Sequence, residues 1–228
     1  MVIVPLAMAA SPGGFRVGAG VPTHVAGARV VVAPELAGPV IAQATVGGQV
    51  ALGKFRVAAD LPVAAVWSEA FDDVGIGNAR LAGAFVWGRT HWQGLGAELL
   101  FPAGPPDARV DAWGSLGRET LPTVAFCVTY EAAFFPEAPF HLRVAAGWQV
   151  QRYRLWYPYY ADLALAHVRP IVGPLSAVGE VELAADPVPL SARLLARLDA
   201  GGVSVDVGAQ QTTRARVPHA IAQVRGFF

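Results

Sequence analysis

The sequence predicts an all-β protein: a transmembrane, antiparallel, up-and-down β-barrel of about twelve strands, with ten or fourteen strands as the alternatives. Three observations predict this fold. The chain is apolar but has no stretch that suits a membrane helix, its side chains alternate in polarity with a period of two, and its expected connections alternate between short and long.

The composition is too apolar for a protein whose whole surface meets water. Mean hydropathy is +0.43 and only 15% of the residues are charged, whereas soluble domains carry about 25%. A membrane helix needs roughly 20 mostly apolar residues in a row. The longest uncharged stretch, residues 36–53, contains Pro39, Gln43 and Gln49 and would make a poor helix. Because only helices and closed barrels satisfy every backbone group in lipid, a barrel is the membrane option that is left.

Charge and cysteine content exclude several kinds of partner. The 17 basic and 17 acidic residues balance, and Lys54 is the only lysine, so no basic stripe is available for nucleic acid. Cys127 is the single cysteine, which offers neither a disulfide nor a cysteine metal site. We therefore expect no nucleic-acid partner, no metal and no cofactor.

The first residues indicate a processed terminus. The segment "MVIVPLAMAAS" is apolar and offers an Ala7-x-Ala9 cleavage site, although the basic leader of a secretory signal is missing. The alternative is a frayed apolar terminus. We expect residues 1–10 to be the remnant of a signal peptide and residues 11–228 to form a single barrel domain.

Alternating polarity predicts the individual strands. Side chains on a strand point to opposite faces in turn, so a barrel wall in lipid is apolar outside and polar inside. In residues 54–67, for example, Phe55, Val57 and Leu61 share one face, while Arg56 and Asp60 share the other. The same pattern places strands near residues 25–33, 40–52, 54–67, 76–89, 91–104, 120–135, 139–152, 159–169, 172–185, 188–199, 203–212 and 217–228. Residues 15–22 also alternate, so they would either extend the first strand or change the count.

The connections between these strands support the same topology. Gly53, Thr90, residues 136–138, Pro170 and residues 200–202 make short connections at one end, and the longest connection, residues 105–119, lies at the other. Outer-membrane barrels have short periplasmic turns and long outer loops. We therefore expect both termini at the periplasmic end.

Aromatic residues gather near both expected ends of the strands. Amphipathic rings prefer the two membrane interfaces, whereas aromatic residues of a soluble β-sandwich, the competing fold, would not form two belts. The expected interface aromatics are Trp67, Trp87, Trp92, Phe134, Phe135, Trp156, Tyr157 and Phe228.

The closing segment "VPHAIAQVRGFF" resembles the terminal signal of bacterial outer-membrane β-barrel proteins. Counting back from Phe228, every second residue is small or apolar: Gly226, Val224, Ala222 and Ala220. The resemblance implies location in the bacterial outer membrane, contact with its lipid, and recognition of the last strand by the barrel assembly machinery. Residues 71–87, "FDDVGIGNARLAGAFVW", are similar to the acidic loop and glycine-rich strand of solute-transporting barrels.

The inward face of the expected barrel carries ionisable side chains of both signs. Lys54 and six arginines face six carboxylates there, and a lateral salt bridge is expected from Arg193 to Glu180 and Glu182. Such groups either line a narrow channel or pair across the interior and close it. The expected lumen-lining residues are Arg56, Asp60, Arg80, Glu98, Glu131, His141, Arg143, Glu180, Glu182, Arg193, Arg197, Asp206 and Arg225.

These features favour an outer-membrane channel or transporter that passes small hydrophilic or amphiphilic solutes by passive diffusion. One alternative is a closed barrel that serves as an anchor, scaffold or subunit of an envelope complex, with an envelope protein or a second copy as partner. Another is a lipid-modifying enzyme, in which His141 or His219 would meet a serine across strands. No GxSxG, metal-ligand spacing or phosphate-binding loop occurs in the sequence, so we expect no enzyme activity.

Overall fold

The computed structural model describes residues 25–34, 40–67, 72–88, 92–103, 123–134, 140–151, 159–184, 190–212 and 218–227. No helix in this part of the chain is long and apolar enough to cross a membrane. The regular elements that it contains are β1 (Val25–Pro34), β2 (Val40–Leu52), β3 (Phe55–Trp67), β4 (Asp72–Ile76), β5 (Asn78–Trp87), β6 (Trp92–Pro102), β7 (Thr123–Phe134), β8 (Phe140–Gln151), β9 (Tyr159–Val172), β10 (Leu175–Ala184), β11 (Leu190–Ala200), β12 (Val203–Thr212) and β13 (His219–Phe227).

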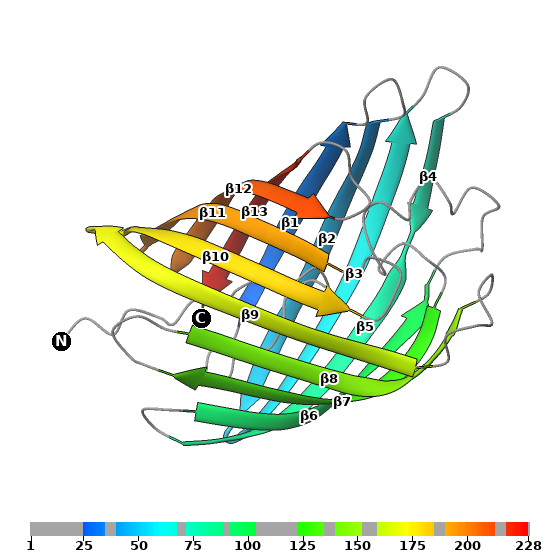
Figure 1. The fold of residues 1–228 in the computed structure, drawn as a ribbon, viewed down its shortest axis with the longest axis horizontal. Helices are drawn as coiled ribbons and strands as arrows, with labels where there is room; N and C mark the ends of the chain where they lie inside the picture. The colour runs from blue at the N-terminus through cyan, green and yellow to red at the C-terminus, as the bar shows by residue number, and fades with distance from the viewer. Residues whose placement is uncertain are drawn as a thin grey trace.

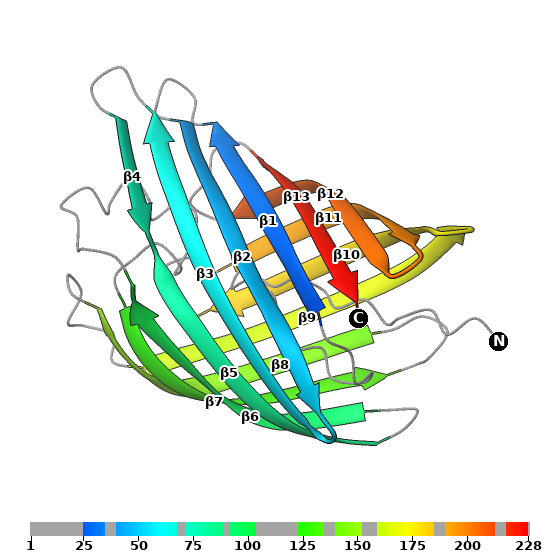
Figure 2. The ribbon, with the colours of Figure 1, turned by 180° about the vertical axis from the view of Figure 1, so that it is seen from behind.

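The strands form one antiparallel sheet that closes on itself. Strands that follow each other in the chain pair, except β4 and β5, which both pair with β3. Strand β1 pairs with β2 on one side and with β13 on the other, from Val25 opposite Phe227 to Val32 opposite Ala220. Figures 1 and 2 show this closure from two sides, with β1 lying beside β13. The prediction of an all-β, up-and-down barrel is therefore confirmed.

The elements β4 and β5 are two halves of one wall strand, so the barrel has twelve strands as predicted. Both halves pair with β3, but the register moves by one residue between the pairs Val63 with Ile76 and Asp60 with Arg80. The extra residue makes a β-bulge near Gly77. The ladder continues through the bulge, because Gly77 N donates to Pro62 O at 2.8 Å and Gly77 O accepts from Ala103 N at 3.2 Å.

The turn predicted at Pro170 is wrong. Strand β9 continues to Val172, and the turn to β10 lies at Gly173, whose φ of 53° favours glycine. Pro170 lies opposite Ser176, directly beside a shift in register. Proline cannot donate to a ladder and is tolerated at such an irregularity, so it did not mark the end of this strand.

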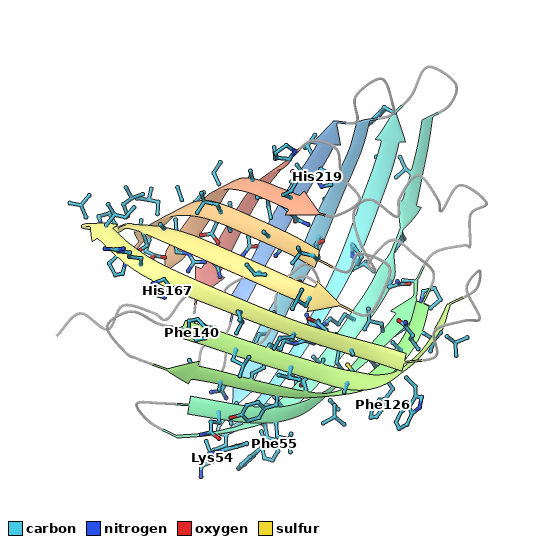
Figure 3. All side chains as sticks on the ribbon, in the orientation of Figure 1. Lys54, Phe55, Phe126, Phe140, His167 and His219 are labelled. Atoms are coloured by element: carbon cyan, nitrogen blue, oxygen red, sulfur yellow. The ribbon has the colours of Figure 1, made fainter. Side chains whose placement is uncertain are left out.

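The outer face of the wall is apolar. Leu81, Phe126, Val144 and Leu194 are 46%, 49%, 39% and 69% exposed, although their neighbours along the strand are buried. Phe126 points away from the barrel in Figure 3. A surface of this kind is stable in acyl chains and not in water. The alternation read from the sequence therefore describes which side chains face outward.

A charge on this outer face should be costly in proportion to its depth in the membrane. Leu194 lies in the middle of β11, whereas Ala200 ends the strand. We expect Leu194→Arg to lower the free energy of unfolding by about 2–4 kcal/mol and Ala200→Arg by about 0–1 kcal/mol. Urea unfolding of the protein refolded into lipid vesicles measures both values. Equal costs at the two positions would contradict a bilayer around this strand.

Candidate functional site

The candidate site is the polar interior of the barrel. Strand geometry turns every second side chain inward. The structure buries on this face Arg56, Asp60, Arg80, Glu98, Arg143, Glu180, Glu182, Arg193, Arg197, Asp206 and Arg225. Glu131 and His141 share the face and are half-buried. Buried charges are stable only when they are paired and hydrogen-bonded, so their partners decide what the interior can do.

A first group, the Arg143 network, connects the inner faces of six neighbouring wall strands. Arg80 Nη1 lies 2.6 Å from Asp60 Oδ2, and Arg80 Nε lies 2.9 Å from Glu98 Oε2. The residues of the network come from β3, β5, β6, β7, β8 and β9, in that order, and are Asp60, Arg80, Glu98, Glu131, Arg143 and Asp162.

Arg143 is the centre of this network because three carboxylates surround it. Its Nη2 lies 2.8 Å from Glu98 Oε2, its Nη1 lies 2.7 Å from Asp162 Oδ2, and its Nε lies 3.4 Å from Glu131 Oε1. The pair with Glu98 spans β7, whose inward residue opposite Glu98 is Cys127. A small side chain at this point leaves room for the guanidinium to reach the carboxylate two strands away.

A second group, the Asp206 network, lies on the inner face of β11, β12 and β13. Arg197 holds both carboxylate oxygens of Asp206, with Nε to Oδ1 at 2.7 Å and Nη2 to Oδ2 at 3.0 Å. Arg225 Nη2 donates to the same Oδ2 at 2.7 Å. One carboxylate therefore joins three strands in the part of the wall that closes the barrel.

Arg193, on the same face of β11 as Arg197, connects β11 to β10 and β12. It lies opposite Glu180 in register, its Nη1 is 3.4 Å from Glu180 Oε2, and its Nε donates to Gln210 Oε1 at 3.0 Å. The lateral salt bridge predicted from Arg193 is therefore present with Glu180. Glu182 lies instead opposite Ser191.

One basic residue lies elsewhere than the sequence predicted. Lys54 was expected inside, but it occupies the turn after Gly53 and is exposed on the outside, because the turn breaks the alternation one residue before β3 begins. His167 is exposed on the outer face of β9. Arg56 is buried as expected and donates to the backbone oxygens of Gly53 at 2.8 Å and Phe55 at 2.9 Å, so it supports this turn.

Two acidic residues of the interior were missed. Asp162 on β9 is 4% exposed and pairs with Arg143, and Asp199 follows Arg197 on the same face of β11. The alternation of β9 places Asp162 on the inner face. It was missed because the next inward residues, Ala164 and Ala166, make that face look apolar in the sequence. With both residues, the described interior holds six arginines and eight carboxylates, so it is more acidic than predicted.

Apolar and histidine side chains also lie on the described inner face. Leu100, Ala125, Cys127 and Ala145 form a buried cluster. No group of three or more His, Cys, Asp or Glu in the described part of the chain could hold a metal ion. The residues that lie opposite His141 are Ala133 and Ala166, and the residue opposite His219 is Gln210. The register therefore places no serine directly beside either of these two histidines.

Part of the predicted aromatic set can be located. Trp67 ends β3 and Trp87 ends β5, at opposite ends of the barrel, and they are 47% and 36% exposed. Trp92 begins β6 and Phe134 ends β7. The remaining predicted interface residues lie outside the described residues: Phe135, Trp156, Tyr157 and Phe228.

Comparisons with known proteins support the fold. No family model matches the sequence, and no curated protein matches it. The structure is similar to an outer membrane channel from Pseudomonas putida F1, with a TM-score of 0.66 and 8% identity over 96% of this chain and 100% of that chain. It is also similar to the KdgM porin, with a TM-score of 0.54 and 9% identity over 90% of this chain and 99% of that chain. The likeness shows the fold, a closed barrel of antiparallel strands, and the apolar outer face is what a barrel in a membrane presents to lipid.

Proposed function

We propose that this barrel is an outer-membrane channel that passes small hydrophilic or amphiphilic solutes by passive diffusion. The observation that carries the proposal is the barrel interior, where ionisable side chains of both signs line the inner face of β3 and of β5 to β13. The likeness of the fold to an outer membrane channel and a porin supports it. No energy source and no catalytic step belong to this function.

Charged side chains in the wall would replace the water that a solute loses on entry. A polar solute pays a large desolvation cost in an apolar passage, and fixed charges along the passage reduce that cost. Among the side chains that the structure describes, six arginines face eight carboxylates, so this part of the interior carries an excess of negative charge. Such an interior should admit cations more readily than anions.

The burial of these charges favours a second candidate, a closed barrel that acts as an anchor or subunit of an envelope complex. Arg197 is 0% exposed and Asp206 1% exposed, and the two are paired with each other, while Asp206 is also paired with Arg225. A twelve-stranded barrel is narrower than the porins of 16 to 18 strands that leave an aqueous channel. Conduction therefore requires that some pairs separate or that water passes beside them.

Conductance and its selectivity test the first candidate directly. Protein refolded into a planar bilayer should give discrete current steps, and in a KCl gradient the reversal potential should have the sign of a cation preference. Asp162→Asn should weaken that preference because it removes one interior carboxylate, whereas Gln211→Ala, on the outer face of β12, should not. A silent protein would contradict the channel and favour the closed barrel. An anion preference would contradict the charge count.

The Arg143 network separates the two candidates further. Arg143→Gln leaves Glu98, Glu131 and Asp162 without their shared cation, so we expect about 3–5 kcal/mol lower stability in urea unfolding. In a channel that these pairs narrow, the variant should also pass more current for each open step. Arg143→Lys keeps the positive charge, so its stability and its current for each open step should lie between those of Arg143→Gln and those of the wild type. A destabilised variant that stays silent would support the closed barrel.

A further inference from the structure

The exposed basic groups of the described wall all lie toward one end of the barrel. Lys54 occupies the turn between β2 and β3, and His167 and Arg169 lie on the outer face of β9, shortly before its turn to β10 at Gly173. Successive turns alternate between the two ends of an up-and-down barrel, so these two turns share the end where the short connections lie. No carboxylate is exposed among the residues whose side chains the structure describes.

Aromatic rings form a platform beneath Lys54. Phe55 and Phe85 lie opposite each other on β3 and β5, with their ring centroids 5.2 Å apart and edge to face. Trp87 stacks on Phe85 at 6.0 Å. The three rings are 58%, 39% and 36% exposed on the outer face of the wall, and Figure 3 shows Lys54 and Phe55 together at its outer edge.

The Lys54 ammonium lies at the boundary of this platform. Its Nζ is 5.9 Å from the centroid of Phe85, which is within the range of a cation–π contact. The rings lie toward the apolar belt, and the ammonium lies at the turn where the belt ends. A long basic side chain at such a boundary keeps its stem on apolar surface and its charge in the headgroup layer. The site therefore offers an apolar surface of aromatic rings and, at its edge, an ammonium group that can donate hydrogen bonds.

The chemistry of this arrangement fits one ligand. A phospholipid has acyl chains that would lie on Phe55, Phe85 and Trp87, and a phosphate that would accept hydrogen bonds from the ammonium. Arg169 and His167 provide a second basic position on the same rim, next to Phe140, which lies opposite His167 in register. A rim with cations and no described exposed carboxylate attracts a headgroup with net negative charge more strongly than a zwitterionic one.

We propose that the short-turn rim of the barrel is a binding site for anionic phospholipid, with Lys54 and the Phe55, Phe85 and Trp87 platform as its main contact and Arg169 as its second. The inference rests on the barrel lying in a membrane and does not depend on whether it conducts. In the orientation expected for outer-membrane barrels, the leaflet concerned is the periplasmic one.

Competition between two lipids tests the site. The probes are phosphatidylglycerol and phosphatidylcholine with identical acyl chains, added in equal amounts to the refolded full-length protein, and native mass spectrometry measures the ratio that stays bound. We expect the wild type to prefer phosphatidylglycerol, and each of Lys54→Gln and Arg169→Gln to reduce the preference about fivefold. The double variant should show little preference, while the variant with Lys54→Arg and Arg169→Lys should retain it.

A matched control and a second measurement keep the test decisive. Gln211→Ala changes an exposed residue of the outer face at the opposite end of the barrel and should leave the lipid ratio unchanged. Far-UV circular dichroism checks that each variant keeps its sheet. If the basic-to-Gln variants do not refold, the wild-type preference should still fall as salt is raised toward 1 M. An equal affinity of the wild type for both lipids, a preference independent of salt, or a folded double variant with the wild-type ratio would overturn the proposal.

Discussion

The pairing of β1 with β13 is the contact on which the rest of the structure depends. Lipid offers no hydrogen-bond partners, so each backbone group of a membrane wall must find its partner within the protein. A sheet does this only when it has no free edge. The contact joins the first and last described strands of the chain, and it turns alternation along each strand into two surfaces, one apolar and one polar. The polar interior and the apolar belt are consequences of this closure.

The interior shows how charges are accommodated once the wall is closed. Removing an ion from water costs several kcal/mol, which a partner offsets only with good geometry. Arg143 and Asp206 offset this desolvation cost because each has more than one partner of opposite charge. Arg143 is paired with three carboxylates, and Asp206 is paired with two arginines. Each network therefore links strands that are not all neighbours in the sheet. The same pairs line the inner face of the wall, so in the proposed channel the contacts that stabilise the barrel would also narrow the path of a solute.

Alternation in the sequence was sufficient to predict twelve strands and the inward face of the described interior charges other than Asp162 and Asp199, because a period of two is imposed by the backbone. The predictions from alternation were wrong where a turn or a bulge interrupts the period of two. The turn at Gly53 puts Lys54 outside, the bulge near Gly77 divides one strand, and Pro170 lies within β9. The partners within the networks were mostly unpredictable. Arg143 binds Glu98 two strands away, across the position of Cys127 on β7, and Asp162 is followed by alanines on the inner face of β9, which made that face look apolar. The register pair of Arg193 with Glu180 was predictable, since a short connection fixes it.

The central claim is that β11 presents alternate side chains to lipid and to the interior, and site-directed spin labelling tests it most directly. In a Cys127→Ser background, single cysteines at residues 190–199 would carry the label, and electron paramagnetic resonance would compare its collisions with oxygen, which concentrates in acyl chains, and with a water-soluble nickel complex. We expect high oxygen accessibility at Leu190, Ala192, Leu194, Ala196 and Leu198 and low accessibility at the residues between them. Uniform accessibility, or a period near 3.6, would contradict it.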